Sequence, residues 1–367
     1  MVSASVVHEN AASEGESSEV VAVAMSGGVD SLVTAALLKN AGHQISGIYL
    51  KLWAGPRQEE NIVALGDICQ RLEIPLQILS LEEEFQSLVI DYFCREYSQG
   101  RTPNPCSTCN QRIKFGLLLD RALGMGIDYL ATGHYARIES SEEGYHLLKG
   151  TDPAKDQSYF LYRLGQRELK HLLFPLGSLH KSEVRKMAAR RGLATDSPRE
   201  SQDICFIPGN DYRAFLAKHI PTRHGDITDT EGSILGRHSG LALYTIGQRQ
   251  GLGLSSKERL HVLRLDATAN RVIVGTKDQL LSSRLTANRL SWIKGAPPQE
   301  TVNMTAKIRY GSAGAATKLY FKGDTAEVNF DKPQSAITPG QDIVFYRGNE
   351  VLGGGIIGGE GNKDNDR

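Results

Sequence analysis

The sequence is short of the features that mark membrane-spanning, disulfide-stabilised and strongly basic proteins. No apolar run approaches the roughly 20 residues that a membrane-spanning helix needs. The five cysteines are too few and too scattered for a disulfide framework, so a reducing cytoplasm is the simplest setting. Lysine and arginine together number 42, as do aspartate and glutamate, so the net charge is zero. An overall basic surface is therefore not expected, although a local basic patch would be enough to bind nucleic acid.

The two ends of the chain lack the patterns of folded elements. Residues 1–18 contain neither the cationic start nor the apolar core of a signal peptide, and we expect a disordered tail there. Residues 359–367 are polar, and a second, loose tail is expected. The whole chain has 367 residues, which predicts two or three domains. A hydrophobic content of 40% and a charged content of 23% are typical of a globular protein in water.

The first glycine-rich loop lacks the lysine of a Walker A sequence, and it does not fit the Rossmann pattern either. It reads Ser-Gly-Gly-Val-Asp-Ser over residues 26–31, between the apolar run Val20–Ala24 and an amphipathic segment that ends near Gly42. The pattern predicts a buried strand, a tight turn and a helix. Because such a turn aims backbone N–H groups and a helix N-terminus at one point, the loop suits a phosphate group.

Strand and helix patterns alternate from residue 20 to about residue 200. Further strands are expected over residues 44–52, 74–81 and 127–131, with helical spacing between them. This alternation predicts an α/β domain with an open parallel sheet. Ligands of such sheets bind beyond the carboxyl ends of the strands. We therefore expect the loop at Ser26, the segment Gly133-His134 and the side chain of Leu50 to meet there, with Leu50 against an adenine ring.

The pattern changes near Gly209, where short strand candidates begin to alternate with glycine turns. The segment 209–282 is predicted to be a small β-rich central domain, with strands over 240–246, 261–265 and 271–275. Five regularly spaced strand candidates follow between residues 301 and 357 and suggest a compact barrel over 283–358. The catalytic domain is accordingly expected over residues 19–208.

Two cysteine-containing stretches have the sharpest chemical pattern. Cys109 follows two prolines, and Ser107 or Thr108 is expected to cap a helix that places Cys109 in its first turn. The helix dipole, together with nearby Arg112 and Lys114, would then favour the thiolate. Cys205 is expected in a short strand after a polar loop over residues 195–202. Cys69 and Cys94 fall on apolar helix faces and are predicted to be structural.

The loop resembles the PP-loop of ATP pyrophosphatases, and six further motifs resemble, in the same order, the tRNA-specific 2-thiouridylases. They are Gly-Arg-Thr-Pro-Asn-Pro-x-x-x-Cys-Asn (100–110), Ala-Thr-Gly-His-Tyr (131–135), Lys-Asp-Gln-Ser-Tyr-Phe-Leu (155–161), Ile-Cys-Phe-Ile (204–207), Gly-Gln-Arg-x-Gly-Leu-Gly (247–253) and Thr-Pro-Gly-Gln (338–341). The resemblance spans about residues 20 to 358. It implies a PP-loop domain, followed by a β-rich domain and a C-terminal barrel that contacts tRNA.

The resemblance also implies the reaction and its residues. ATP would adenylate O2 of the wobble uridine, a persulfide on Cys205 would supply sulfur, and Cys109 would be the attacking or disulfide-forming cysteine. The implied ATP site consists of Ala24, Met25, Ser26, Gly27, Gly28, Val29, Asp30, Ser31, Leu50 and Gly133. The implied tRNA contacts are Asn104, Pro105, Cys106, His134, Lys155, Asp156, Gln157, Arg309, Tyr310 and Gln341.

The same resemblance implies further partners. A cysteine desulfurase or a sulfur-relay protein would donate the persulfide, and Mg²⁺ would accompany ATP, with Asp30 as a weak candidate ligand. Helix residues Lys181, Arg185, Lys186, Arg190 and Arg191 form a basic stretch that either binds tRNA phosphates or is merely solvated.

One residue departs from a common family pattern. Cys106 stands where many members have an aspartate to which a proton-transfer role is assigned. Either another group, with His134 a candidate, moves that proton, or the step does not need this carboxylate. The change creates a Cys-x-x-Cys spacing, and Cys106, Cys109 and Cys205 together could ligate an iron–sulfur cluster. The cluster is the alternative to the persulfide route. No other metal site is expected, because a zinc site would want a fourth ligand.

Two other classes of function remain open on the sequence alone. A ligase or amidotransferase would keep the PP-loop but would have no use for Cys109 and Cys205. An RNA-binding protein with a degenerate nucleotide site would not need the intact residues of the loop at Ser26. Serine substitution of either cysteine, and tRNA-dependent release of AMP and pyrophosphate, would separate these readings.

Overall fold

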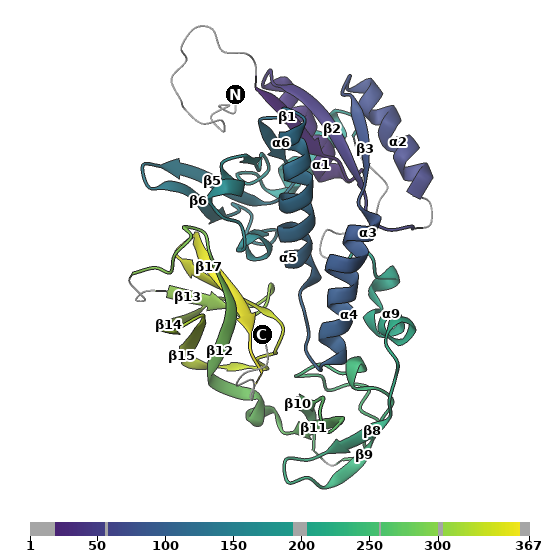
Figure 1. The fold of residues 1–367 in the computed structure, drawn as a ribbon, viewed down its shortest axis with the longest axis vertical. Coiled ribbons are helices and arrows are strands. Elements are labelled where there is room, and N and C mark those ends of the chain that lie inside the picture. The colour runs from purple at the N-terminus through teal and green to yellow at the C-terminus, as the bar shows by residue number, and fades with distance from the viewer. Residues whose placement is uncertain (1–18, 56–57, 194–203, 257, 300–303, 360–367) are drawn as a thin grey trace.

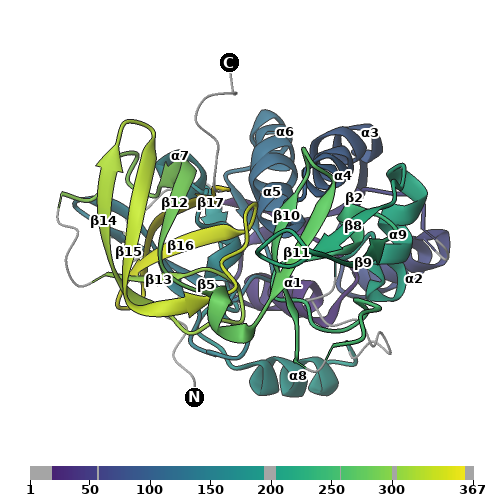
Figure 2. The same cartoon turned by 90° about the horizontal axis from the view of Figure 1, so that it is seen from below.

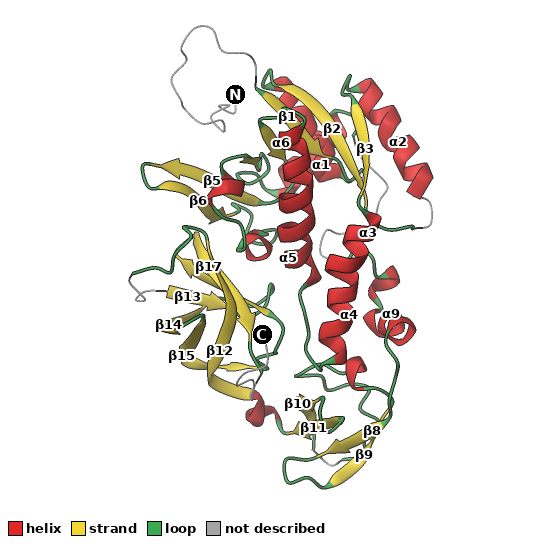
Figure 3. Cartoon of the chain, viewed as in Figure 1, coloured by secondary structure: helices red, strands yellow, loops and turns green. Residues whose placement is uncertain are grey.

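One part of the protein combines most of the helices with a parallel sheet, and the other two parts consist mainly of strands. The computed structural model describes residues 19–55, 58–193, 204–256, 258–299 and 304–359. Figure 3 shows the helix-rich part above a small sheet and beside a larger sheet. The expected tails, at 1–18 and 359–367, lie outside the described residues except for Gly359. The expected loop over 195–202 lies wholly outside them.

A five-stranded parallel sheet forms the centre of the first part, in the order β3-β2-β1-β4-β7. Figure 1 shows its strands β1, β2 and β3 side by side. All four neighbouring pairs are parallel, which confirms the predicted open parallel sheet. The strands are β1 (Val20–Ala24), β2 (Gln44–Lys51), β3 (Leu76–Ser80), β4 (Tyr129–Ala131) and β7 (Leu172–Leu173). The sequence analysis missed β7, because a strand of two residues has no period to detect.

Alternate residues of β1 point to two hydrophobic cores, one on each face of the sheet. Val21 and Val23 pack in one core with helices α1 (Val29–Asn40), α2 (Gln58–Arg71) and α8 (Lys181–Arg190). Ala22 packs in the other core with Phe115, Leu118 and the helix α6 (Leu119–Gly124). Both faces of the sheet are therefore covered, as the continuous apolar run of β1 requires.

Several short helices connect the sheet with the rest of the protein. One long helical run is made of α5 (Pro105–Cys109), a π-helical segment (Asn110–Leu118) and α6. A second run is made of α3 (Glu82–Phe85), a π-helical segment (Gln86–Ile90) and α4 (Asp91–Ser98). Helix α9 (Tyr212–His219) joins the core that holds Phe85, Phe93 and Cys109. The remaining short helix is α7 (Gln166–Leu169).

The central part is a four-stranded sheet in the order β10-β11-β8-β9. Its strands are β8 (Gly225–Thr228), β9 (Ile234–His238), β10 (His261–Asp266) and β11 (Arg271–Gly275). The predicted β-rich character and the last two strands are confirmed. The strand expected over residues 240–246 is wrong, because Leu241–Leu243 forms a 3-10 turn whose Leu241 packs into the core of this sheet.

The C-terminal part is a closed barrel of six antiparallel strands, in which β12 pairs with both β15 and β17. Figure 2 shows this barrel and the central sheet as separate groups of strands. The strands are β12 (Leu281–Trp292), β13 (Met304–Lys307), β14 (Ala315–Lys322), β15 (Thr325–Ser335), β16 (Asp342–Arg347) and β17 (Glu350–Ile357). The predicted barrel is confirmed, with β12 as a strand that the sequence analysis missed.

A hairpin from the first part extends the barrel sheet. Strands β5 (Ala136–Ser141) and β6 (Gly144–Lys149) pair with each other, and β6 pairs with β17 at Leu147–Val351 and Leu148–Glu350. The side chain of His146 reaches Glu350 across this junction, with Nδ1 and Oε1 2.6 Å apart. The hairpin thus fixes the barrel against the sheet domain.

A second contact fixes the barrel against the segment that leads into α5. The backbone N–H of Thr102 donates to the carbonyl of Pro339 at 2.8 Å, and the Gln341 side-chain amide donates to the carbonyl of Thr102 at 2.8 Å. Gly340 has a φ of +89°, and a Cβ there would lie 2.9 Å from Cβ of Arg101. Only glycine therefore allows the two backbones to come this close.

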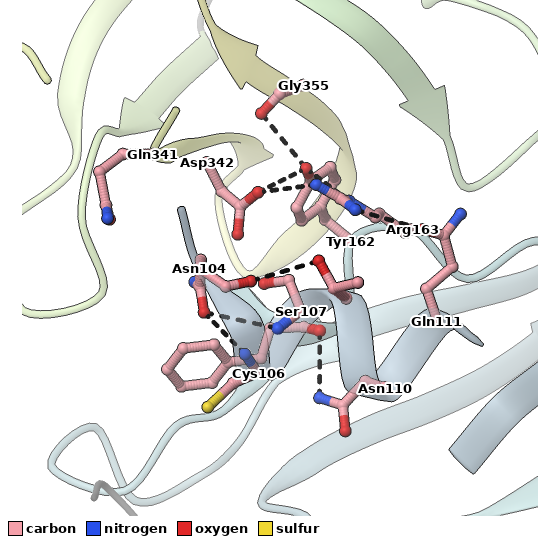
Figure 4. Close-up of polar contacts among 12 residues, drawn as sticks. Asn104, Cys106, Ser107, Asn110, Gln111, Tyr162, Arg163, Gln341, Asp342 and Gly355 are labelled. Atoms are coloured by element: carbon pink, nitrogen blue, oxygen red, sulfur yellow. Dashed lines mark hydrogen bonds and ion pairs between the residues drawn. The ribbon is translucent and has the colours of Figure 1, made fainter. Parts of the chain in front are cut away.

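Next to this contact lies a buried ion pair between the barrel and the sheet domain. Asp342 is 1% exposed, and its Oδ1 accepts hydrogen bonds from Arg163 Nη2 at 3.0 Å and from the Tyr162 hydroxyl at 2.8 Å. Figure 4 shows Arg163 between Asp342 and Gln111, to whose side-chain oxygen Arg163 Nη1 donates at 3.2 Å. Charge, hydroxyl and amide groups thus meet around Asp342 Oδ1, whereas the buried Asp342 Oδ2 has no hydrogen-bond partner among the described residues.

We expect Arg163→Met to destabilise the protein by about 3 kcal/mol, because it leaves the buried Asp342 carboxylate without its cation. Chemical denaturation followed by tryptophan fluorescence would measure this change. Arg284→Met is the matched control, since Arg284 is exposed and lies 4.0 Å from Glu327, and it should change stability by less than about 1 kcal/mol. Equal effects of the two substitutions would contradict the role of the buried pair.

Candidate functional site

The loop at residues 26–31 has the predicted form of a strand, a turn and a helix. Gly27 has a φ of +77°, a conformation that favours glycine. The Ser31 hydroxyl donates to the carbonyl of Gly28 at 2.9 Å and accepts from the N–H of Ser26 at 3.2 Å, so the hydroxyls hold the turn. Gly28 is the N-cap of α1, and no side chain caps the helix. The first N–H groups of α1 are left for an anion.

Asp30 is held by two groups from distant parts of the chain. Its two carboxylate oxygens lie 2.6 and 2.7 Å from the ammonium of Lys181, and Oδ1 also accepts from the Tyr135 hydroxyl at 2.8 Å. Lys181 begins α8, where its backbone N–H donates to Asp152 at 2.9 Å. This hydrogen bond is the main reason that the pKa of Asp152 is lowered. The loop therefore has a lysine beside it after all, supplied by a helix far along the sequence.

The carboxyl ends of β1 and β4 meet as expected. A Cβ on Gly133 would lie 2.9 Å from Cβ of Asp30, so only glycine allows the two loops to touch. Met25, at the end of β1, is buried and donates its N–H to Ile48 of β2 at 2.8 Å. Leu50 lies near the end of β2 and packs between two hydrophobic cores. The structure thus brings the expected ATP-site residues to one edge of the sheet.

The helix that carries Cys109 begins earlier than the sequence analysis expected. Asn104 is its N-cap, and Asn104 Oδ1 accepts hydrogen bonds from the N–H groups of Cys106 at 3.2 Å and Ser107 at 3.4 Å (Figure 4). Pro105 occupies the first helical position, where its missing N–H costs nothing. The prediction that Ser107 or Thr108 is the cap is therefore wrong, because the Asn-Pro pair starts the helix one turn sooner.

Cys205 lies close to Cys106 and Cys109, although it is far from them in the sequence. Both of these thiols act electrostatically on Cys205. Cys109 packs in the same core as Ile204 and Phe206, the two neighbours of Cys205. Cys205 lies in a turn, in which Ile207 N–H donates to Ile204 at 3.0 Å, so the expected strand is wrong. The turn lets Phe206 and Ile207 enter the core while Cys205 stays exposed.

Burial, rather than the helix dipole, decides the protonation state of the thiols of Cys106, Cys109 and Cys205. Desolvation raises the pKa of Cys109, and raises that of Cys106 to about 11 and that of Cys205 to about 12. Cys205 is accessible to solvent but has protein around it, which explains why an exposed thiol is also desolvated. The prediction that the first helical turn favours a Cys109 thiolate is therefore wrong. Each free thiol is protonated at neutral pH.

Lys114 is the cation that the three thiols share. It lowers the pKa of Cys106, Cys109 and Cys205, and it also lowers that of His134. Burial is the larger cause at His134, whose pKa falls well below its usual value, so its imidazole is neutral. The sequence analysis named Lys114 only as a neighbour of Cys109. Lys114 follows Cys109 by little more than one helical turn, and this spacing was the sequence signal that Lys114 could act on several groups at the site.

His134 lies between the nucleotide loop and the cysteine helix. Its Nδ1 lies 2.7 Å from the Thr132 hydroxyl, and its ring contacts those of Phe115 and Phe174. Phe115 belongs to the same helical run as Cys109. The ring of His134 is thus fixed between the end of β4 and the helix that carries the thiols.

The expected tRNA contacts form two groups. In the first, Asp156 accepts from the N–H groups of Gly150 at 3.0 Å and Ser158 at 3.1 Å, and Gln157 accepts from the N–H of Tyr135 at 3.0 Å. The N–H of Lys155 donates to the carbonyl of Asp152 at 3.1 Å. These bonds shape the turn beside His134. Asp156 is buried, so its bonds hold the backbone of the turn.

The second group comes from the barrel. Gln341 contacts the carbonyl of Thr102, two residues before Asn104, and Figure 4 shows it beside Asp342 and Asn104. Tyr310 lies against Phe160, with ring centres 4.6 Å apart. Arg309 is exposed and donates to the carbonyls of Ser335 and Ala336. Because Phe160 accepts a hydrogen bond from Asn110, the barrel residues reach the same helix as Cys109.

Three family models match successive parts of the chain. One described as tRNA methyl transferase HUP domain matches residues 19–209, one described as tRNA methyl transferase PRC-barrel domain matches 213–276, and one described as aminomethyltransferase beta-barrel domain matches 282–357. The order agrees with the parallel sheet, the small central sheet and the closed barrel.

Curated relatives match nearly the whole chain. The tRNA-specific 2-thiouridylase MnmA of Geobacter metallireducens is 48% identical over 354 residues, which cover 92% of this chain and 96% of the relative. The protein of the same name from Syntrophomonas wolfei is 46% identical over 343 residues, with 92% and 99% covered. Among solved structures, the U34-tRNA thiolase NcsA from Methanococcus maripaludis, with its 4Fe-4S cluster, is 20% identical with a TM-score of 0.37, covering 56% of this chain and 66% of that chain. That likeness is too distant to carry an argument.

We expect Lys181→Met to weaken ATP binding about tenfold, because the Asp30 carboxylate would then face the phosphates without its cation. Isothermal titration with ATP would measure the affinity. Lys186→Met removes an exposed lysine from the same helix and serves as the control, with unchanged affinity expected. If the two variants bind ATP equally well, Lys181 has no part in the nucleotide site.

The raised pKa of Cys205 predicts an unusual pH dependence of its alkylation. Because only the thiolate reacts, the rate should rise about tenfold per pH unit through pH 10, whereas an ordinary thiol with a pKa of about 8.5 levels off sooner. Timed labelling with iodoacetamide and peptide mass spectrometry would follow the reaction. Lys114→Met should slow it further, because losing the cation raises the pKa. A plateau near pH 9 would contradict the assignment.

Proposed function

The chain belongs to the family of tRNA-specific 2-thiouridylases, and from that premise we propose which of its residues carry out each step of the reaction. The enzyme is a tRNA-uridine 2-sulfurtransferase, which replaces O2 of the wobble uridine of tRNA by sulfur with the use of ATP. The observation that carries our proposal is the meeting of Cys109 and Cys205 at one site.

The first step needs a leaving group, because the O2 oxygen of uridine leaves poorly. Attack of O2 on the α-phosphorus of ATP would form an adenylated uridine and release pyrophosphate. We assign the pyrophosphate to the N–H groups at the start of α1 and to Lys181, which lies 2.6 Å from Asp30 of the loop. Gly133 and Leu50 would border the rest of the nucleotide, because both lie at the same edge of the sheet.

The second step transfers sulfur. A persulfide on Cys205 is more acidic than the free thiol, so it can be an anion at neutral pH where the thiol of pKa about 12 cannot. Its terminal sulfur would attack C2 of the uridine and displace AMP. Cys109 would then attack Cys205 Sγ, which frees the 2-thiouridine and leaves a Cys109–Cys205 disulfide. Lys114 is placed to stabilise each sulfur anion in turn.

The target uridine would lie between the cysteine helix and the barrel. We propose that Asn104, Pro105 and Cys106 approach the base, with Lys155, Asp156 and Gln157 shaping the opposite side of its pocket. His134, Arg309, Tyr310 and Gln341 complete the proposed tRNA contacts. The ring of Tyr310 on Phe160 offers a surface for an unstacked base, and the exposed Arg309 offers a charge for a phosphate. The boundaries 19–208, 209–282 and 283–358 remain our proposal for the catalytic, central and tRNA-contacting domains.

Metal chemistry has a small place in this proposal. Mg²⁺ would arrive with ATP, bound by phosphate oxygens, since Asp30 is already engaged by Lys181 and Tyr135. Within the described residues, no group of three histidine, cysteine or acidic side chains is arranged to hold a metal ion. We propose the persulfide route rather than a cluster held by Cys106, Cys109 and Cys205, and we route no step through an iron–sulfur cluster.

The surroundings of the enzyme follow from its chemistry. We propose a cysteine desulfurase or a sulfur-relay protein as the donor of the persulfide, because Cys205 is the exposed member of the three thiols. In the part of the chain that the structure describes, no helix is long and apolar enough to cross a membrane. A cytoplasmic location is our proposal, since both the tRNA substrate and free thiols belong to a reducing compartment.

We expect Cys109→Ser and Cys205→Ser each to reduce 2-thiouridine formation to the background level, while tRNA-dependent release of pyrophosphate continues. Nucleoside mass spectrometry and a pyrophosphate assay would measure the two steps. Cys69→Ser and Cys94→Ser are matched controls and should keep both activities, because neither thiol is among the groups that act electrostatically on Cys205.

A serine variant at position 109 or 205 that still forms 2-thiouridine would refute this assignment of the two cysteines. Anaerobic purification with iron and sulfide analysis tests the alternative directly. An active enzyme that contains iron and sulfide in stoichiometric amounts would replace the persulfide route with the cluster route.

A further inference from the structure

We propose that Cys106 is a resolving cysteine, which attacks Cys109 in the Cys109–Cys205 disulfide and moves the disulfide to the pair Cys106–Cys109. This inference rests on the proposed function, because it concerns the step that follows sulfur transfer. It gives a task to the one thiol of the site that sulfur transfer itself leaves unused, and it explains why the site holds three thiols rather than two.

The helix places Cys106 and Cys109 within bonding reach of each other. They are three residues apart in the first turns of the helical run that begins at Pro105. Ideal helix geometry puts their Cα atoms about 5 Å apart, inside the range of about 4.4–6.8 Å that disulfides span. Cys109 also acts electrostatically on Cys106, and both act on Cys205. The helix spacing thus brings Cys106 to Cys109, and Cys205 lies near enough to both for their charges to act on it.

The three thiols differ in exposure in the way that the proposal needs. Cys109 is 8% exposed and packs in the core with Phe93 and Phe206, so an external reductant cannot easily reach its sulfur. Cys106 is half-buried, and Figure 4 shows its sulfur pointing away from Asp342 and the barrel. Cys205 is exposed, as a residue that accepts sulfur from another protein must be.

The exchange balances without an added oxidant. The Cys106 thiol loses its proton, and its sulfur attacks Cys109 Sγ; the Cys109–Cys205 bond breaks, and Cys205 leaves as a thiolate that takes up a proton. One disulfide is lost and one is formed, so no electrons enter or leave the protein. A dithiol reductant then reduces the Cys106–Cys109 disulfide, while Cys205 is already free to accept the next sulfur. The resolving step thus separates sulfur loading from reduction.

Disulfide mapping after a single turnover tests the proposal. The full-length enzyme, with a persulfide loaded on Cys205, is mixed with ATP and tRNA without reductant, quenched with acid and labelled with N-ethylmaleimide. Trypsin cuts at Arg101 and Arg112, so one peptide contains both Cys106 and Cys109. We expect that peptide to carry an internal disulfide and Cys205 to be labelled. A cross-linked Cys109–Cys205 product in the unmodified enzyme would overturn the proposal.

The variant Cys106→Ser provides the second test, with Cys94→Ser as control. We expect each 2-thiouridine formed in a single turnover of this variant to leave the Cys109–Cys205 disulfide in place, and a multiple-turnover rate, relative to the single-turnover rate, about tenfold lower at limiting dithiol. A single turnover of the variant that forms 2-thiouridine without accumulating the Cys109–Cys205 disulfide would overturn the resolving role. An unchanged multiple-turnover rate would overturn it as well. Failure of the proposed function itself would be recognised separately, by thiolation that survives Cys109→Ser.

Discussion

The contact between the barrel and the segment before α5 is the constraint on which the site depends. Gly340 lets the barrel backbone approach Arg101 and Thr102, and Asp342 buries its charge against Arg163 one step further on. The first contact holds Thr102, and the second reaches the helical run that begins at Pro105 through Gln111, to which Arg163 donates. Because Asn104, two residues after Thr102, caps that helix, the barrel holds in place the backbone from which Cys106 and Cys109 project. The barrel is thus part of the framework of the helix that carries these two cysteines.

Two opposing electrostatic effects set the resting state of the site. Burial raises the pKa of each thiol, while Lys114 lowers it, and burial is the larger effect at all three. A protonated thiol is a poor nucleophile, so the free cysteines are protected from side reactions. A persulfide is more acidic, and a disulfide needs attack only at a neighbouring sulfur. Under the proposed mechanism, the enzyme with a persulfide on Cys205 would react at neutral pH more readily than the enzyme with the free thiol.

Short sequence patterns predicted the turns and strands whose form depends on residues close together in the chain. The loop at Ser26 could be predicted because glycine and hydroxyl residues fix its turn, and the meeting of Gly133 with Asp30 followed from the geometry of parallel strands. The Asn104 cap was missed because Ser107 and Thr108 are equally good caps by residue type, and only the position of Pro105 decides between them. The turn at Cys205 was missed because Phe206 and Ile207 have strand propensity, which their core contacts override.

The interactions between distant segments could not be predicted from such patterns. The pairing of β6 with β17 and the ion pair of Lys181 with Asp30 each join residues far apart in the sequence, and no local period reports them. Lys181 was placed in a basic helix that was considered for tRNA phosphates. The Lys181 ammonium instead lies beside the loop at Ser26, which has no lysine of its own. A lysine can therefore reach such a loop from any element that comes to the carboxyl edge of the sheet, and its absence from the loop sequence does not exclude it from the neighbourhood of the loop.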